Sequence, residues 1–286
     1  MIFIVDSGST KCDWIAIDKK GNKLFEKVRT RGLNPEILKP HELRERLEEN
    51  ETLMEYKDKV EQIFFYGAGC GTERPTLELA TVLRNFFTNA VVKVEEDTMA
   101  AIYSTINDHE PAVVCILGTG SNCTYYDGEK AIQRVISLGY ILMDDASGNY
   151  YGKRLIRDYK FHHMPEDLRI AFKDKFDVDS DVIKFNIYDR PNPNAYLAKF
   201  AEFMFLYKEN PYIHELIKSG IREFAENYIF QFKEELKKAP VHFAGSIAYL
   251  SQDEIHEVAK EMGFTVGNFV RRPIDGVVAY HKRNLA

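Results

Sequence analysis

The chain has 286 residues, of which 45% are hydrophobic and 29% are charged. This length predicts about two domains, and the composition excludes global disorder because it supplies enough apolar side chains for a core. With 38 basic and 44 acidic side chains, the net charge of -6 disfavours general nucleic-acid binding. No apolar run of about 18 residues and no secretory signal is present, so we expect a cytoplasmic protein without a membrane partner.

The cysteines do not form a metal-binding or disulfide pattern. No two of them form a C-x-x-C pair, and none is grouped with histidines at zinc-ligand spacing. Three of the four stand in apolar, strand-like segments, which favours small buried side chains in a reducing compartment. The four residues are Cys12, Cys70, Cys115 and Cys123.

The first half of the chain predicts three strands followed by alternating helices and strands. Apolar, β-branched residues open the chain, and two alternating segments follow on either side of the hairpin signal at 19–22. Beyond a loop at 32–35, helical periodicity alternates with short apolar runs. The predicted strands are 1–6, 12–18, 23–30, 61–66 and 90–95, and the predicted helices are 36–49, 75–88 and 97–107.

The same order of elements then restarts. The predicted elements are strands 112–117, 123–126 and 131–136, a mostly helical stretch at about 150–238, strand 241–244, helix 251–262, strand 264–270 and a helix from Asp275. A repeated unit of three strands followed by alternating elements indicates a duplicated α/β architecture. We therefore predict a first domain at 1–109 and a second at 110–286, with the helical stretch inserted in the second.

The first chemical motif is Asp6–Lys11, between two predicted strands. Glycine permits close backbone approach, and Ser and Thr hydroxyls with backbone N–H groups can cradle a phosphate. The carboxylate of Asp6 suits a hydrated Mg²⁺, and Lys11 can neutralise phosphate charge. The alternative is an ordinary hairpin turn, in which Gly and Ser are common.

The second motif, Gly118–Cys123, follows another buried strand. It is similar to a dinucleotide-binding fingerprint, with Cys123 in place of the last glycine, but that site needs a helix next. The following residues predict a strand and a turn, so we reject the dinucleotide site. The pattern favours a second strand–turn–strand phosphate clamp.

Three further candidates stand at strand ends or in loops. Asp97 fits either a helix N-cap or a general base at the carboxyl end of a strand. The pair Asp144 and Asp145 fits either a hydroxyl- or metal-binding site or a solvated loop. The turn Gly245-Ser246 fits either a tight connection or a place where an adenine or ribose approaches the backbone.

In this order, the motifs resemble those of the actin-like ATPase and sugar kinase superfamily. The resemblance is closer to the BadF/BadG/BcrA/BcrD ATPase family, which includes N-acetylglucosamine kinases. It covers nearly the whole chain and is most specific at Gly118–Asn122. It implies an α/β fold of two actin-like (ribonuclease H-like) domains, with mixed sheets flanked by helices and a ligand cleft between them. It also implies ATP and Mg²⁺ as cofactors and a homodimer.

The resemblance also implies roles for individual residues. The ATP- and phosphate-binding residues would be Asp6, Gly8, Ser9, Thr10, Lys11, Gly118, Thr119, Gly120 and Ser121, with Gly245 and Ser246 at the adenosine turn. Asp97 would be the catalytic aspartate, and Mg²⁺ would bind near Asp6 through water. The sugar-contacting residues would be Asn34, Asp97, Thr119 and Asp144.

The sequence departs from the kinases in one segment. The kinases carry Gly-Gly-Trp-Gly ahead of Gly-Asp-Glu-Gly-Ser, where this chain has Ile-Ser-Leu-Gly at 136–139 and Met-Asp-Asp-Ala-Ser at 143–147. In the kinases this segment shapes the sugar pocket. The resemblance therefore leaves N-acetylglucosamine, glucosamine and N-acetylmuramic acid open as substrates.

The predicted reaction is ATP-dependent phosphorylation of an amino sugar such as N-acetylglucosamine. The predicted acceptor is the 6-hydroxyl group of that sugar. The first alternative is an ATPase activator of an iron–sulfur dehydratase or reductase, which needs interface cysteines, and only Cys70 stands in an evident loop. The second is a sugar-responsive regulator, which would need an added DNA-binding segment. The chain begins directly with its first predicted strand, so we do not expect this function.

Overall fold

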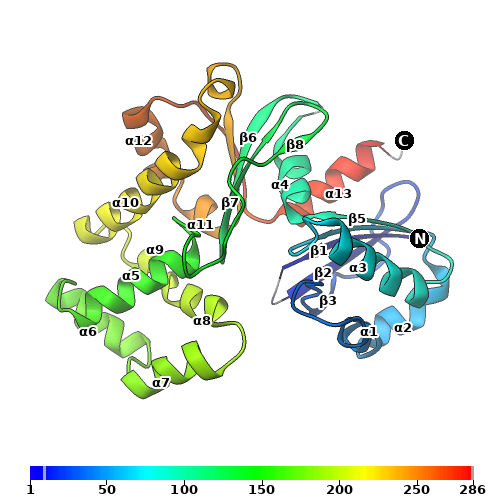
Figure 1. The fold of residues 1–286 in the computed structure, drawn as a ribbon, viewed down its shortest axis with the longest axis horizontal. Helices are drawn as coiled ribbons and strands as arrows, with labels where there is room; N and C mark the ends of the chain where they lie inside the picture. The colour runs from blue at the N-terminus through cyan, green and yellow to red at the C-terminus, as the bar shows by residue number, and fades with distance from the viewer. Residues whose placement is uncertain (9–10, 108, 285–286) are drawn as a thin grey trace. The chain divides into compact units, whose positions relative to one another are not determined.

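The computed structural model describes residues 1–8, 11–107 and 109–284. The chain forms two compact units, each with its own five-stranded sheet (Figure 1). Unit 1 comprises Met1–Ser104 and Arg272–Ala286, and unit 2 comprises Thr105–Arg271. Among the described residues, no helix is both long and apolar enough to cross a lipid bilayer.

The sheet of unit 1 is mixed. Its strands are β1 (Ile2–Ser7), β2 (Lys11–Ile17), β3 (Val28–Arg31), β4 (Gln62–Gly67) and β5 (Val91–Glu96), in the spatial order β3-β2-β1-β4-β5. β1 pairs antiparallel with β2 and parallel with β4, and β4 pairs parallel with β5. β3 is therefore an edge strand, and three parallel strands point their carboxyl ends to one edge of the sheet.

Helices cover both faces of this sheet. They are α1 (Pro40–Glu48), α2 (Glu51–Tyr56), the short 3₁₀ helix η1 (Lys57–Lys59), α3 (Glu73–Phe86), α4 (Asp97–Thr105) and α13 (Pro273–Asn284). Alternation along β1 sends Phe3 and Val5 into a core with α1, α2 and α3. Ile2 and Ile4 point to the opposite face and pack with residues of α4 and α13. β1 is thus buried on both faces at the centre of the unit.

Unit 2 repeats the strand arrangement of unit 1. Its strands are β6 (Ala112–Leu117), β7 (Ser121–Tyr126), β8 (Ala131–Ile132), β9 (Val241–Ala244) and β10 (Val266–Val270). The spatial order is β8-β7-β6-β9-β10, with the first hairpin antiparallel and β6, β9 and β10 parallel. Taken in chain order, this arrangement matches that of unit 1 strand for strand. The predicted duplicated α/β architecture is confirmed.

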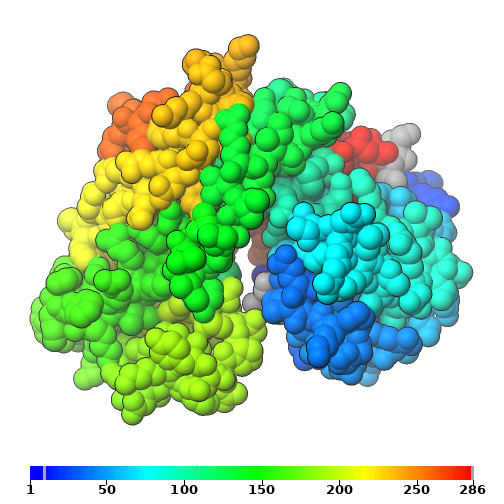
Figure 2. All heavy atoms as spheres, in the orientation of Figure 1, coloured from blue at the N-terminus to red at the C-terminus, as the bar shows by residue number. Residues whose placement is uncertain are grey.

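A long helical segment separates β8 from β9. Its helices are α5 (Gly148–Lys160), α6 (Glu166–Lys175), α7 (Ser180–Lys184), the π-helical turn η2 (Phe185–Asp189), α8 (Pro193–Phe200), α9 (Glu202–Leu206), α10 (Pro211–Asn227) and the 3₁₀ turns η3 (Ile229–Phe232) and η4 (Glu235–Lys237). In Figure 2 its atoms, green to yellow, form a closely packed block. Two further helices, α11 (Ser246–Leu250) and α12 (Gln252–Met262), connect β9 to β10.

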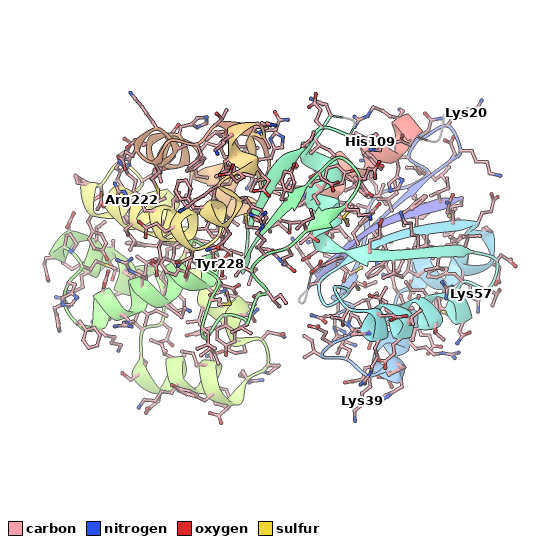
Figure 3. All side chains as sticks on the ribbon, turned by 45° about the horizontal axis from the view of Figure 1, so that its top comes forward. Lys20, Lys39, Lys57, His109, Arg222 and Tyr228 are labelled. Atoms are coloured by element: carbon pink, nitrogen blue, oxygen red, sulfur yellow. The ribbon has the colours of Figure 1, made fainter. Side chains whose placement is uncertain are left out.

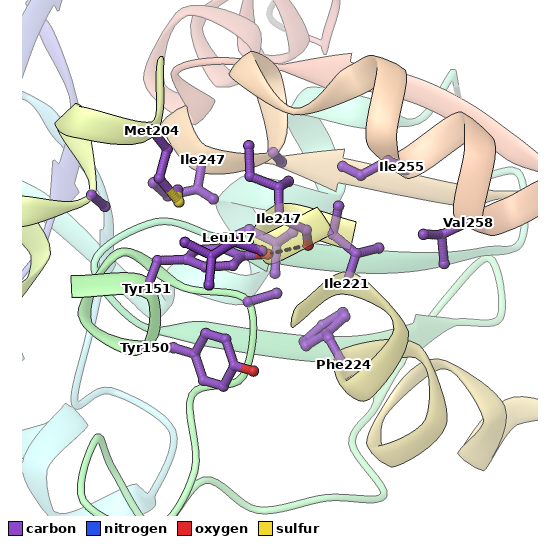
Figure 4. Packing of buried hydrophobic residues seen from close by; sticks show 14 of the residues in the cluster. Leu117, Tyr150, Tyr151, Met204, Ile217, Ile221, Phe224, Ile247, Ile255 and Val258 are labelled. Carbon is purple, nitrogen blue, oxygen red and sulfur yellow. Dashed lines mark hydrogen bonds between the residues drawn. The ribbon is translucent and has the colours of Figure 1, made fainter. Parts of the chain in front are cut away.

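The core of unit 2 joins the sheet to these helices. Val113, Cys115 and Leu117 of β6 belong to one apolar cluster with α5, α10 and α12. Tyr151 of α5 is fully buried in it, and its hydroxyl donates to the carbonyl oxygen of Ile217 at 2.8 Å (Figure 4). The buried hydroxyl therefore has a partner, which fixes how α5 and α10 pack.

In contrast to the buried core residues, several lysines lie on the surface. Lys20 and Lys39 of unit 1 are exposed and extend away from the backbone (Figure 3). Lys20 stands in the hairpin turn that the sequence predicts, where Asp18 Oδ1 accepts bonds from the N–H groups of Lys20 and Asn22, each at 2.8 Å. Such an Asx turn is a local signal, which explains why it is visible in the sequence.

Three predicted elements are shorter than expected. The predicted helix 36–49 is wrong at its start, because α1 begins at Pro40, a residue well suited to the first helical position. The predicted strand 23–30 is found only as Val28–Arg31. The predicted strand 131–136 is reduced to Ala131–Ile132, and Arg134 instead binds Glu235 of η4, which draws the chain away from the sheet.

The C-terminal helix also differs from expectation. The predicted second domain, 110–286, includes it, whereas Arg272–Ala286 belongs to unit 1. Ile274 and Val277 of α13 are buried and pack with Ile2 and Ile4 of β1. Burial of this apolar face explains the placement, since an amphipathic helix packs wherever a complementary face is open.

Close packing of α5 on α8 generates a stability prediction. A Cβ added at Gly152 would lie 1.9 Å from the carbonyl oxygen of Leu197, a backbone atom that cannot rotate away. Gly152→Ala should therefore lower the free energy of unfolding by about 1–3 kcal/mol, although alanine favours helices. Chemical denaturation measures this change. Arg157→Ala, at an exposed position of α5, should change it by less than about 0.5 kcal/mol. A Gly152→Ala protein as stable as the parent would contradict the packing described.

Candidate functional site

The register of unit 1 brings three strand ends together. Ser7 of β1 pairs with Gly67 of β4, and Gly67 pairs with Glu96 of β5. Because these strands are parallel, the loops that follow them start from one edge of the sheet. Asp6 and Asp97 therefore stand near each other, one at the end of β1 and the other at the first residue of α4, although 91 positions separate them in the chain.

Asp6 and Asp97 are electrostatically strained carboxyl groups. Burial, together with the carboxylates of Glu96 and Asp6, raises the pKa of Asp97 to about 7. Burial, together with the carboxylate of Asp13, raises the pKa of Asp6 to about 6, and the ammonium groups of Lys11 and Lys27 oppose this shift. Two acids that titrate near neutrality at one sheet edge form the acidic centre of unit 1.

Asn34 is held beside this edge by the end of β1. The hydroxyl of Ser7 accepts a hydrogen bond from the backbone N–H of Leu33 at 2.9 Å, and both residues are buried. Asn34 Oδ1 accepts from the N–H of Glu36 at 2.9 Å. A Cβ added at Gly69 would lie 2.1 Å from Asn34 Oδ1, so the loop after β4 packs directly on this amide.

The first predicted phosphate turn joins β1 to β2. The N–H of Gly8 donates to the carbonyl oxygen of Lys11 at 3.0 Å, which closes a hairpin. Lys11 begins β2 with an exposed side chain, close enough to Asp6 to oppose its raised pKa. Ser9 and Thr10, also predicted to bind phosphate, lie outside the described residues.

The second predicted phosphate turn, Gly118–Ser121, joins β6 to β7 in unit 2. The N–H groups of Gly148 and Asn149, at the start of α5, donate to the carbonyl oxygens of Gly118 at 2.7 Å and of Thr119 at 3.0 Å. The carbonyls of the turn are thus occupied by α5. The N–H groups of Thr119 and Gly120 have no acceptor among the residues that the structure describes, so both can serve an anion.

Asp144 braces this turn. Its Oδ1 accepts from the N–H of Ser121 at 3.2 Å, and its Oδ2 accepts from Asn149 Nδ2 at 2.8 Å. A Cβ on Gly120 would lie 2.8 Å from Asp144 Oδ2, so only glycine permits this approach. Asp144 itself has φ of 73°, a left-handed conformation that its contacts hold in place.

Two buried polar atoms at this turn lack partners. Within the described part of the chain, Ser121 Oγ and Asn149 Oδ1 are buried without a hydrogen bond. Such orphaned groups are costly and are commonly satisfied by a bound molecule. The turn is therefore built with spare hydrogen-bonding capacity as well as free N–H groups.

Gly245 lies against the same turn. Its φ is 109°, and a Cβ there would lie 2.4 Å from the carbonyl oxygen of Leu117, the last residue of β6. The N–H of Gly245 donates to Val270 at 2.9 Å. Ser246 follows as the first residue of α11 and is exposed. The predicted second phosphate turn and the predicted adenosine turn are therefore adjacent within unit 2.

The residues present fit Mg²⁺ bound mainly through water. Among the described residues, no group of three or more His, Cys, Asp or Glu side chains forms a metal site. The raised pKa values of Asp6 and Asp97 nevertheless indicate carboxylates without sufficient positive charge nearby. Magnesium commonly keeps several waters and binds one or two protein carboxylates plus substrate phosphates. Asp6 is therefore the residue that would hold it.

Sequence reasoning missed three residues of these sites. Ser7 positions the segment before Asn34, Asn149 holds the second turn and Asp144 together, and Glu96 raises the pKa of Asp97. Ser7 lies inside the first motif, so its place in the sequence already indicates that it belongs to the site. Nothing in the sequence around Asn149 indicates its role, because its contacts depend on where α5 begins.

The raised pKa of Asp97 generates a pH-dependent stability prediction. Its folded-state pKa, about 7, exceeds the reference value of 3.8, so the folded state binds more protons between these values. The charged Asp97 thus costs stability as the pH rises through this window, whereas asparagine resembles the neutral acid. Asp97→Asn should raise the free energy of unfolding by about 1–2 kcal/mol at pH 8, and the gain should shrink toward pH 5.

Urea unfolding at pH 5 and pH 8 measures this effect. Asp167→Asn, at an exposed position in the first turn of α6, is the matched control and should show no such pH dependence. If Asp97→Asn destabilises the protein equally at both pH values, the carboxyl group is not strained in the folded state.

The fold of this chain recurs in solved structures of other proteins. No protein-family model matches the chain, and no curated protein matches it with significance. Among solved structures, the chain matches a Porphyromonas gingivalis protein, provisionally described as an N-acetylglucosamine kinase, with a TM-score of 0.91 and 31% identity over 100% of both chains.

Two further solved structures share the fold. A Chromobacterium violaceum protein with the same provisional description gives a TM-score of 0.68 and 16% identity over 98% of each chain. A ROK family glucokinase from Streptomyces griseus was solved with glucose and AMPPNP. It gives a TM-score of 0.59 and 13% sequence identity, over 98% of this chain and 97% of the glucokinase chain. With two mixed sheets in the arrangement of the sugar kinases and 31% identity over its full length to the Porphyromonas gingivalis protein, the chain belongs to the actin-like sugar kinase superfamily.

Proposed function

We propose that this protein phosphorylates a hydroxyl group of an amino sugar, using ATP. The observation that carries the proposal is the position of Asp97, at the carboxyl end of β5 beside Asp6, with its pKa raised to about 7. A carboxylate with a pKa near the working pH is well matched to receive a proton from a hydroxyl. Superfamily membership supports the same reaction class.

Asp97 acts as the general base in this proposal. It orients the acceptor hydroxyl and takes its proton as the oxygen attacks the γ-phosphorus of ATP, while the bond from that phosphorus to the β,γ-bridging oxygen breaks and ADP leaves. Phosphoryl transfer depends mainly on alignment and charge neutralisation, so one positioned base with correctly held phosphates suffices. Asn34, buried and packed on Gly69, presents its amide at the same sheet edge and is the proposed sugar contact.

The phosphates of ATP would be held by the two turns. The N–H groups of Thr119 and Gly120 and the hydroxyl of Ser121 are available donors in unit 2. Lys11, with Gly8, Ser9 and Thr10, would serve the phosphates in unit 1, and Gly245 and Ser246 the adenosine. When bound near Asp6, Mg²⁺ would offset the charge that develops on the transferred phosphoryl group.

We further propose N-acetylglucosamine as the acceptor and its 6-hydroxyl as the reacting group. The support is the provisional description of the Porphyromonas gingivalis protein, which shares 31% identity with this chain. Asp144 retains lone pairs beyond the two bonds that it accepts, so it can hold the turn and also accept from a sugar hydroxyl. The narrower BadF/BadG/BcrA/BcrD assignment is part of the same proposal.

The alternative of an iron–sulfur activator gains no support from the thiols. All four cysteines are buried, and burial, together with the carboxylates of Asp97, Glu96 and Glu36, raises the pKa of Cys70 to about 12. A cluster ligand must be a thiolate. The thiol of Cys70 therefore does not readily form the thiolate that an iron–sulfur cluster requires in this conformation.

A panel of sugars tests the proposal directly. ATP consumption is measured with N-acetylglucosamine, glucosamine, N-acetylmuramic acid and glucose, and the product is identified by phosphorus NMR. We expect turnover to depend on an amino sugar and the product to be its 6-phosphate. ATP hydrolysis that no sugar stimulates would contradict the kinase assignment.

Asp97→Asn is the variant that tests the mechanism. Loss of the base should lower turnover by about 10²–10⁴-fold while the affinity for AMPPNP stays within about twofold. Asp167→Asn serves again as the matched control and should retain full turnover. An Asp97→Asn protein with most of its activity would exclude Asp97 as the base.

A further inference from the structure

A groove of about 430 Å³ lies at the edge of the unit 1 sheet, and Lys11 is the one residue among its described lining that is also assigned above. The groove follows the edge strand β3, the start of β2 and the C-terminal end of α1. We call it the edge groove, and its lining residues are Lys11, Arg29, Thr30, Arg31, Arg46, Glu49 and Asn50. Four of these seven are cationic and one is acidic, in a chain whose net charge is -6.

The strand register places cations side by side. Lys11 of β2 pairs directly with Arg31 of β3, and the next pair on the same face is Asp13 with Arg29. Two positive side chains that stand directly opposite each other destabilise a sheet unless a nearby carboxylate offsets their repulsion. Asp13 supplies that charge to Arg29 at 2.7 Å and also to Lys27 at 2.9 Å. No acid stands opposite Lys11 in the register, because Arg31 occupies that position.

Arg31 and Arg46 each bind an oxygen acceptor of the protein, and their two positive charges act on each other. Arg31 Nη2 contacts both carboxylate oxygens of Glu49, at 2.6 and 2.8 Å. Arg46 lies nearby and donates to the carbonyl oxygen of Gly32. Burial, with the neighbouring charge of Arg31, lowers the pKa of Arg46. A further anion in the groove would therefore relieve repulsion between two arginines that Glu42 and Glu49 only partly neutralise.

We propose that the edge groove binds the phosphate group of a small molecule. Phosphate is favoured because it accepts bonds from several cationic groups at once, which matches the two guanidinium groups of Arg31 and Arg46. The volume exceeds that of one phosphate, so the groove also accommodates a small organic substituent. The proposal does not depend on the kinase reaction, although Lys11 belongs to both sites.

Calorimetric titration of the whole chain tests the site, with AMPPNP present at saturation to fill the proposed ATP site. The probes are inorganic phosphate, a hexose 6-phosphate and the same hexose without phosphate, all at constant ionic strength. Binding of both phosphate probes but not of the free hexose supports the site and identifies phosphate alone as sufficient. Binding of the hexose phosphate only also supports it and identifies a phosphomonoester as the ligand. Binding of neither phosphate probe to the parent protein would overturn the proposal.

A double variant and a matched control locate the binding. Arg31→Gln with Arg46→Gln should weaken phosphate binding by roughly tenfold or more, because it removes charge-assisted hydrogen bonds. Arg44→Gln is the matched control: Arg44 is also on α1, where it pairs with Glu48 at 2.7 Å, and it does not line the groove. Its affinity for phosphate should stay within about twofold of the parent. An equal loss in the Arg44→Gln protein would overturn the proposal, because nonspecific attraction would then explain the binding.

Glu49→Gln gives a result of opposite sign. Glu49 competes for Arg31, so its neutralisation should strengthen phosphate binding, which a merely destabilised protein would not show. Unchanged or weaker binding by Glu49→Gln would contradict the role of Arg31. Because affinity for AMPPNP is measured separately, failure of the proposed ATP site would not be confused with failure of the edge groove.

Discussion

The candidate site of unit 1 depends on the cost of holding carboxylates where water cannot fully solvate them. Parallel β1, β4 and β5 end in register, and this alone places Asp6 and Asp97 at one edge of the sheet. Burial raises the pKa of both carboxyl groups, Glu96 and Asp6 raise that of Asp97 further, and Asp13 raises that of Asp6 further. A structure selected for stability alone would replace one of these groups, and retention of both is characteristic of functional sites.

Unit 2 uses the same strand order for different chemistry. Among the described residues, the backbone N–H groups of Thr119 and Gly120 and the hydroxyl of Ser121 in the turn after β6 have no hydrogen-bond partner. The N-terminus of α5, Asp144 and Asn149 hold the turn in shape. The helical segment therefore contributes to the site indirectly, because it packs α5 against α8 and α10 and so fixes where α5 begins. One duplicated topology thus supplies an acidic centre in unit 1 and a turn with available hydrogen-bond donors in unit 2.

Most of the fold follows from local patterns. Strand alternation, the two glycine turns and the Asx turn at Asp18 are short-range signals, and the structure contains each of them. The ends of strands that depend on distant partners could not be predicted. Strand 131–136 is cut short because Arg134 binds η4, and α13 joins unit 1 because its apolar face fits β1. These contacts join residues roughly 100 or more positions apart, which no periodicity records.

In the candidate site too, some features follow from local sequence patterns and others depend on contacts between distant residues. Asp6, Asp97 and the two turns stand at strand ends, where sequence order and the rules of α/β sheets already indicate function. The brace formed by Asp144 and Asn149 and the cationic edge groove depend on side chains from separate elements, so only the three-dimensional arrangement reveals them.

The pH dependence of sugar phosphorylation tests the central claim most directly. If Asp97, with its pKa near 7, must be ionised to accept the hydroxyl proton, kcat/KM should fall by about tenfold for each pH unit below that value. The measurement uses the sugar that supports turnover, over a pH range in which the protein stays folded. A profile that stays flat from about pH 5 to pH 8, with chemistry as the slow step, would contradict the assignment of Asp97 as the base.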